Sequence, residues 1–388
     1  MQEENFETLA IRLQAERTQF KEHSVPLYLT SSYKFDDAEE MRALFANEKE
    51  GHVYSRYANP NTDELINKMA VLEGAENGWA TASGMAAIFT TFMTFLASGD
   101  HVLSSRSVFG STHQLLNNIF PKWGITYDYA DLDKPEQWEQ GIRPNTKMIF
   151  VETPSNPGID IIDLEWLGQL AKKNGILLVV DNCFATPYLQ QPIKLGADIS
   201  IHSATKFIDG QGRTLGGIIL GSHQLIKEIE GFARHSGPAM APFNAWLLSK
   251  SLETLAVRMD RHCESALKVA EFLERNPVVK KVMYPFLPSH PQYEIAKKQM
   301  KQGGGIVTFV IEGGAAAASA FMDKLKMFSI SANLGDTRSI ATHPATSTHS
   351  KLTEAQRLEV GIEQGTVRLS IGLEHINDIL GDISQALV

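Results

Sequence analysis

The feature that most constrains the fold is an alternation of helix-period segments with short apolar runs, which extends from about residue 59 to residue 250. Leu164, Leu167 and Leu170 recur at helical spacing and precede the apolar run 176–180. A second short run, 199–202, follows after a loop. Helices that alternate with buried strands build βαβ units, so this pattern predicts a mostly parallel central sheet flanked by helices.

The two ends of the chain follow other patterns. The N-terminal stretch combines a short amphipathic start with polar, loop-like segments, which predicts an arm rather than a core. The last third begins with a long helical pattern at 251–275 and continues with strand-like runs at 305–311 and 367–371. We therefore expect three parts: an N-terminal arm at 1–58, a large domain at 59–250 and a smaller C-terminal α/β domain at 251–388.

Composition narrows the class of protein and of partner. The 388 residues carry a net charge of -9, which argues against a nucleic-acid binder and favours small-molecule partners. The two cysteines, Cys183 and Cys263, are far apart and outside any CxxC pattern, so neither disulfides nor a cysteine-rich metal site is expected. The acidic N-terminus has no apolar signal segment, and no run is long enough to span a membrane, so we expect a cytoplasmic protein.

A first polar signal is Asp181, which follows the apolar residues Val179 and Val180. Open α/β sheets build ligand sites at the carboxyl ends of their strands, so an acid at this position is a candidate site residue. The alternative is a cap for the following turn, and Asp181 alone does not decide between the two.

A second signal surrounds Lys206, which follows the hydroxyl residues Ser203 and Thr205 and precedes Gly210 and Gly212. A desolvated lysine amine becomes a nucleophile and can hold an aldehyde cofactor as a Schiff base. The neighbouring hydroxyl groups suit a phosphate. The alternative, a solvated surface lysine, is disfavoured by these neighbours.

A third signal is the small-residue turn Ser83-Gly84-Met85, which leads into an apolar helix. Free backbone N–H groups and the helix dipole at such a start favour a bound phosphate. A plain turn with a capping serine is the alternative explanation.

Taken in this order, the signals resemble the Cys/Met-metabolism enzymes that depend on pyridoxal 5'-phosphate (PLP). The attachment pattern of that family, Thr-Lys-aromatic-aliphatic-x-Gly-Gln-Gly, is matched without a gap at 205–212. The resemblance implies PLP-dependent fold type I, the aspartate-aminotransferase-like fold. Further family landmarks follow in order over nearly the whole chain, at 54–56, 59–60, 152–157, 334–336, 343–344 and 368–374.

The resemblance also implies roles for residues around the cofactor ring. Lys206 is expected to hold PLP as a Schiff base and to move protons, and Asp181 to pair with the pyridinium nitrogen. Asn156 is expected to contact the phenolic oxygen of the ring. Arg368 is expected to clamp the substrate carboxylate with two hydrogen bonds, although a structural salt bridge is an alternative.

At the phosphate, the resemblance implies a set of residues from two subunits. Tyr54 and Arg56 come from the neighbouring subunit in the family, so we expect a homo-oligomer with shared active sites, and a homotetramer is the usual family assembly. A surface cation–π pair is the alternative for these two residues. The residues expected at the phosphate are Gly84, Met85, Ser203, Thr205, Tyr54 and Arg56.

Three positions depart from the pattern of the γ-lyases in this family. Phe109 stands where many members have a tyrosine that stacks on the ring, so stacking is kept and the phenolic acid is lost. Ser111 stands where methionine γ-lyases carry a cysteine, and Asn333, an expected substrate-binding residue, replaces a serine. Together with the run 209–213, these positions most resemble the O-succinylhomoserine sulfhydrylase branch.

That branch implies replacement of the acyl group of O-succinylhomoserine or O-acetylhomoserine by sulfide, which gives homocysteine for methionine biosynthesis. Cystathionine γ-synthase, cystathionine γ-lyase and methionine γ-lyase stay open as alternatives, and a non-catalytic scaffold is a remote one. A nicotinamide enzyme is disfavoured because no G-x-G-x-x-G follows the first strand. His202, His343 and His349 lack metal-ligand spacing and receive no catalytic role.

Overall fold

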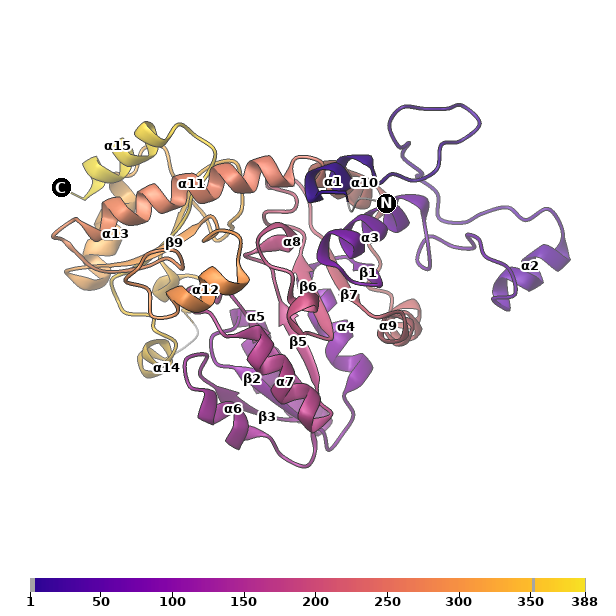
Figure 1. Cartoon of the computed structure of the whole chain (residues 1–388), viewed down its shortest axis with the longest axis horizontal. Coiled ribbons are helices and arrows are strands. Elements are labelled where there is room, and N and C mark those ends of the chain that lie inside the picture. The colour runs from indigo at the N-terminus through magenta and orange to yellow at the C-terminus, as the bar shows by residue number, and fades with distance from the viewer. Residues whose placement is uncertain (1–3, 351–352, 388) are drawn as a thin grey trace.

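The computed structural model describes residues 4–350 and 353–387, which are built around two sheets (Figure 1). The larger sheet has the strand order β1-β7-β6-β5-β4-β2-β3, and β7 alone runs antiparallel to its neighbours in this described sheet. The prediction of a mostly parallel central sheet is therefore confirmed. Its strands are β1 (Asn77–Thr81), β2 (His101–Ser105), β3 (Thr126–Ala130), β4 (Thr146–Glu152), β5 (Leu177–Asp181), β6 (Ile199–Ser203) and β7 (Gly217–Gly221).

Helices cover both faces of this sheet, which explains why central strands such as β4 and β5 are buried at almost every position. Along β5, Val179 packs into one apolar cluster with α4 and α9, while Val180 packs into another with α6 and α7. The helices of this part are α3 (Pro60–Glu73), α4 (Gly84–Phe95), α5 (Gly110–Gln114), α6 (Pro135–Gly141), α7 (Leu164–Asn174), α8 (Thr186–Leu189), α9 (His223–Ser236) and α10 (Pro242–Leu252).

Local sequence signals explain where these helices begin and end. The side chain of Asp163 accepts a hydrogen bond from the N–H of Trp166 at 3.1 Å and so caps α7. Gly175 ends the same helix with φ at 65°, a conformation that suits glycine. Shorter irregular helical turns lie at Leu115–Ile119, Phe120–Trp123, Pro192–Leu195 and Pro344–Thr346.

The second sheet has the order β10-β11-β12-β9-β8 and pairs antiparallel except between β10 and β11. The runs predicted as strands at 305–311 and 367–371 are found within one residue as β9 and β12. The elements of this part are α11 (Leu255–Glu274), β8 (Val279–Met283), α12 (Tyr293–Gln299), β9 (Ile306–Ile311), α13 (Gly314–Lys324), β10 (Ser329–Ile330), β11 (Ile340–Thr342), α14 (Glu354–Glu359), β12 (Thr366–Ser370) and α15 (Ile376–Ala386).

The long helix α11 connects the two sheets. Its first half, with Leu255 and Met259, packs in the same apolar cluster as Leu65 of α3. Its second half, with Val269 and Leu273, packs in the cluster of the C-terminal sheet. Apolar contact therefore continues across the predicted boundary between residues 250 and 251, and the domain limits stay a prediction.

The N-terminal segment leaves the body of the molecule and returns to it (Figure 1). Helix α1 (Phe6–Arg12) contacts α3, and its Ala10 is buried, so the expected arm does contribute to the core at this point. Between α1 and α3 the chain projects outward and carries α2 (Ala38–Phe45) at its far end, where Phe45 is exposed, as Phe20 is earlier in the segment. Within the described ranges, no helix has both the length and the apolar character that crossing a membrane requires.

Candidate active site

A cavity of about 270 Å³ opens at the carboxyl ends of β4, β5 and β6, where an open α/β sheet places its ligand site. The first turn of α4 forms one side of it, and segments from the C-terminal part close another. The cavity is lined by Ser83, Gly84, Met85, Ile88, Phe109, Glu152, Asn156, Asp181, Cys183, Phe184, Ser203, Thr205, Lys206, Leu215, Ala332, Leu334, Thr348 and Arg368.

The fold thus brings together nine of the twelve residues predicted for the site, although they are spread from residue 84 to residue 368. Asn333 adjoins the cavity through a hydrogen bond to Lys206. Tyr54 and Arg56 do not line it. The nine lining residues are Gly84, Met85, Phe109, Asn156, Asp181, Ser203, Thr205, Lys206 and Arg368.

Lys206 lies just beyond the end of β6 with its amine in the cavity. Its Nζ donates a hydrogen bond to Oδ1 of Asn333 at 2.9 Å. Burial, and to a smaller extent the charge of Arg368, lower the pKa of the Lys206 amine. A larger fraction of neutral amine is available as a result, which fits attack on an aldehyde.

Asp181 ends β5 and is buried at the floor of the cavity. Burial raises the pKa of its carboxyl to about 6. Its Oδ1 also accepts a hydrogen bond from the N–H of Cys183 at 3.0 Å, so the alternative role as a turn cap is present as well. Asp181 also lines the cavity, so its carboxyl group fits a partner of positive charge such as a protonated ring nitrogen.

The first turn of α4 forms an anion cradle. Ser83 caps the helix by accepting a hydrogen bond from the N–H of Ala86 at 3.1 Å, and the N–H groups at the start of the helix have no partner within it. A Cβ on Gly84 would lie 2.6 Å from Cβ of Ser203, so only glycine allows β6 to approach this turn. Oγ1 of Thr205 accepts from the N–H of Gly216 at 3.2 Å, which leaves its hydroxyl hydrogen for a ligand. These groups fit the phosphate of PLP.

Arg368 is a buried cation whose bonding is incomplete. Its two terminal nitrogens donate to Oδ1 of Asn156 at 2.9 Å, to the carbonyl of Asn333 at 3.1 Å and to Oγ1 of Thr342 at 3.3 Å. Its Nε is buried without a hydrogen-bond partner among residues 4–350 and 353–387. Burial lowers its pKa to about 10, so the side chain stays charged at neutral pH. Such a group fits a carboxylate ligand better than a structural role.

Two ionisable residues of the cavity lining were not predicted. Glu152 ends β4, and its Oε2 accepts a hydrogen bond from the N–H of Phe109 at 2.7 Å. Cys183 lies two residues after Asp181, and burial raises the pKa of its thiol. The only sequence signal for Glu152 was its place at the start of the landmark 152–157, and Cys183 had none.

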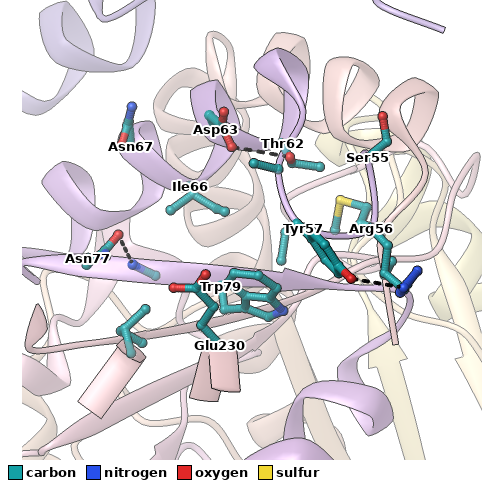
Figure 2. Close-up of a pocket in the computed structure, with 16 residues that line it drawn as sticks. Ser55, Arg56, Tyr57, Thr62, Asp63, Ile66, Asn67, Asn77, Trp79 and Glu230 are labelled. Atoms are coloured by element: carbon teal, nitrogen blue, oxygen red, sulfur yellow. Dashed lines mark hydrogen bonds between the residues drawn. The ribbon is translucent and has the colours of Figure 1, made fainter. Parts of the chain in front are cut away.

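Tyr54 and Arg56 lie instead at the base of the projecting segment. Figure 2 shows Arg56 with Tyr57 beside a second cavity of about 240 Å³, which Trp79 and Glu230 also line. The guanidinium lies 4.9 Å from the ring centroids of both Tyr54 and Tyr57. Within one chain, Arg56 and Tyr54 therefore form the cation–π pair expected as the alternative to phosphate binding by these residues.

The three histidines that received no catalytic role each form a hydrogen bond with another protein side chain. His202 contacts Glu73 at 2.9 Å, His343 contacts Thr346 at 2.8 Å, and His349 contacts Thr348 at 2.9 Å. The described lining of the cavity includes none of these histidines.

Comparison with known proteins agrees with this geometry. The family model described as Cys/Met metabolism PLP-dependent enzyme matches residues 7–388. The O-succinylhomoserine sulfhydrylase of Pseudomonas aeruginosa is 49% identical over 382 residues, which cover 98% of this chain and 95% of that protein. The L-methionine gamma-lyase of Pseudomonas putida is 43% identical over 364 residues, which cover 93% of this chain and 92% of that protein.

Solved structures agree as well. A Campylobacter jejuni structure described as an O-acetylhomoserine (thiol)-lyase superposes with a TM-score of 0.95 at 36% identity, covers 99% of both chains, and contains N'-pyridoxyl-lysine-5'-monophosphate. A metB structure from Corynebacterium glutamicum gives a TM-score of 0.94 at 39% identity, over 99% of this chain and 98% of that one. The predicted fold type I architecture and the PLP cofactor are thereby confirmed. The chain belongs to the Cys/Met metabolism family of PLP-dependent enzymes.

Proposed function

We propose that this enzyme replaces the succinyl group of O-succinylhomoserine by sulfide, which yields homocysteine and succinate for methionine biosynthesis in the cytoplasm. Relatives named O-succinylhomoserine sulfhydrylase from Pseudomonas aeruginosa and Mycobacterium tuberculosis support this donor, at 49% and 44% identity. L-methionine gamma-lyases match at 40–43%. O-acetylhomoserine is the alternative donor.

The observation that carries the proposal is Phe109 in the wall of the cavity. Its ring can stack on the cofactor, but it has no hydroxyl that could protonate a departing group. A thiolate leaving group, as in methionine cleavage, benefits from such a proton, whereas a carboxylate leaves without it. The site therefore favours acyl-homoserine donors over methionine.

Four polar residues at the cavity receive tasks in this proposal. The amine of Lys206 removes a proton from the substrate and returns it, while Asn333 holds that amine in place. Arg368 binds the substrate carboxylate, and Asp181 pairs with the ring nitrogen. When bound, PLP supplies the electron sink that stabilises negative charge on the substrate carbon.

We further propose that the active site is shared between subunits of a homotetramer. Tyr54 and Arg56 of one chain would reach the phosphate held by α4 of another. The projecting segment between α1 and α3 supports this, because it leaves the body of its own chain and exposes apolar side chains such as Phe20 and Leu29.

The direct test is to measure homocysteine or cystathionine formation with both acylated homoserines, each against sulfide and cysteine, beside 2-oxobutyrate release from methionine. We expect the highest kcat/KM for O-succinylhomoserine with sulfide. A preference for cysteine would instead identify a cystathionine γ-synthase. Dominant methionine cleavage would contradict the argument from Phe109.

A further inference from the structure

Glu152 is a second carboxyl group in the cavity, and the tasks assigned above do not use it. It is paired in register with Asp181 on the neighbouring parallel strand. Residues paired in this way place their side chains on the same face of a sheet. Glu152 is 3% exposed and Asp181 is 7% exposed, and both line the cavity, so two carboxyl groups lie on the same face of the sheet with little access to water.

The charged and titratable groups around Glu152 come from several elements. Burial, and after it the charge of Asp181 of β5, raise the pKa of Glu152 well above its usual range, while the N–H of Phe109, the charge of Arg368 of β12 and the N–H of Asn156 act in the opposite direction. Cys183 lies beside the pair with a thiol whose pKa is raised, and His202 of β6 acts on Asp181. The environment therefore favours a proton on one of the two carboxyl groups.

A hydrogen bond links the Glu152 carboxyl group to the backbone of Phe109, which lines the cavity. Oε2 of Glu152 accepts the backbone N–H of Phe109 at 2.7 Å, directly before α5 begins. That bond fixes the backbone from which the Phe109 ring enters the cavity. A neutral carboxylic acid keeps an acceptor oxygen and can also accept this bond, although the bond to a carboxylate is stronger and lowers the pKa of Glu152.

We propose that Glu152 is a positioning residue that carries a proton in the working enzyme, holds the backbone of Phe109, and leaves Asp181 as the single negative charge facing the ring nitrogen. Two ionised carboxylates side by side in a buried site would repel each other. A proton stored on Glu152 removes that repulsion and keeps the charge on Asp181, where the cofactor needs it.

The inference rests on the PLP dependence of the family and not on the choice of donor. It is therefore tested without substrate, by measuring the Kd of the apoprotein for PLP and the visible absorption band of the loaded protein. Glu152→Gln keeps a neutral acceptor of the same shape, whereas Glu152→Leu removes the acceptor. Glu64→Leu, at another buried glutamate that does not belong to the cavity lining, serves as the matched control.

We expect Glu152→Gln to bind PLP within about threefold of the wild type, and Glu152→Leu to bind about tenfold more weakly with a shifted band, because the N–H of Phe109 loses its buried partner. Glu64→Leu should lower the unfolding temperature but leave the band in place. Infrared difference spectra should contain a protonated-carboxyl signal that disappears in Glu152→Gln.

Two results would overturn the proposal. If Glu152→Gln binds PLP as weakly as Glu152→Leu, PLP binding requires a negative charge on Glu152. The proposal that Glu152 carries a proton is then wrong. If Glu152→Leu keeps both the wild-type Kd and the wild-type band, Glu152 has no positioning role. A wrong donor assignment would change neither readout, so the two failures are distinguishable.

Discussion

Nζ of Lys206 donates a hydrogen bond to Oδ1 of Asn333 at 2.9 Å, and this bond joins positions 127 residues apart in the chain. The lysine follows β6 of the larger sheet, while Asn333 lies between β10 and β11 of the C-terminal part. The direction of the amine is therefore set by the packing of one part of the molecule on the other.

The first prediction concerns this bond. Asn333→Ala should lower kcat/KM by about tenfold, because a hydrogen bond of ordinary net strength to the amine is lost. Asn333→Ser, which keeps a short acceptor, should lose less and should raise the share of γ-elimination product. Steady-state assays of homocysteine and 2-oxobutyrate measure both effects. Unchanged kinetics in Asn333→Ala would show that the amine does not depend on this residue.

The second prediction concerns Arg368. Arg368→Lys keeps the positive charge but loses the planar fork, so we expect kcat/KM for the donor to fall by about a hundredfold, mainly through KM. The visible band of the bound cofactor should stay unchanged, because Arg368 acts on the substrate. A lost band with normal KM would place Arg368 in cofactor binding instead.

The third prediction follows from the pKa of Asp181, which is raised from 3.8 to about 6 in the folded protein. The folded chain then binds this proton more tightly than the unfolded chain, so the associated stability is present below pH 4 and is lost as pH rises through 6. Between pH 4 and pH 7, the free energy of unfolding of the wild-type apoprotein should fall by up to about 3 kcal/mol relative to that of Asp181→Asn. Urea unfolding at several pH values across this range measures the free energy of unfolding of both proteins. The same pH dependence in both proteins would contradict the prediction.

The same titration predicts an effect of the cofactor. Saturating PLP should remove much of the pH-dependent loss of unfolding free energy in the wild type, because the ring nitrogen supplies a counter-charge to Asp181. In Asp181→Asn, PLP should stabilise the protein less.

The fourth prediction tests the shared active site. Lys206→Ala and Arg56→Ala should each be nearly inactive alone. Co-expression at equal levels should restore about a quarter of wild-type activity, since half of randomly formed dimers contain one intact site of two. Tyr57→Phe, which changes a neighbour in the same segment, is the matched control. No recovery in the mixture would mean that Arg56 acts within its own chain.

The sequence predicted the parts of the site that depend on local pattern. Lys206, Asp181 and the turn at Gly84 each follow a strand or begin a helix, so short motifs identify them. Glu152 was missed because its importance comes from register: Asp181 becomes its neighbour only when β4 and β5 pair. Cys183 was missed because nothing in its local sequence indicates that it lines the same cavity as Lys206.

Element boundaries show a similar limit. The helical pattern predicted at 251–275 begins inside α10, because the break at Glu253 and Thr254 carries neither glycine nor proline. Burial of Ala10 was also not predictable, since the apolar cluster that contains it is assembled from segments distant in the sequence. Tertiary packing decides such details.

The position of α11 has a consequence for how the enzyme can move. Because this helix packs in the apolar clusters of both sheets, it links the part of the molecule that carries Lys206 to the part that carries Arg368. A rigid-body rotation of one sheet against the other would break the close packing along α11. Closure over a substrate is therefore expected from the connecting loops at 331–339 and 343–350, while the lysine and the arginine keep a fixed spacing.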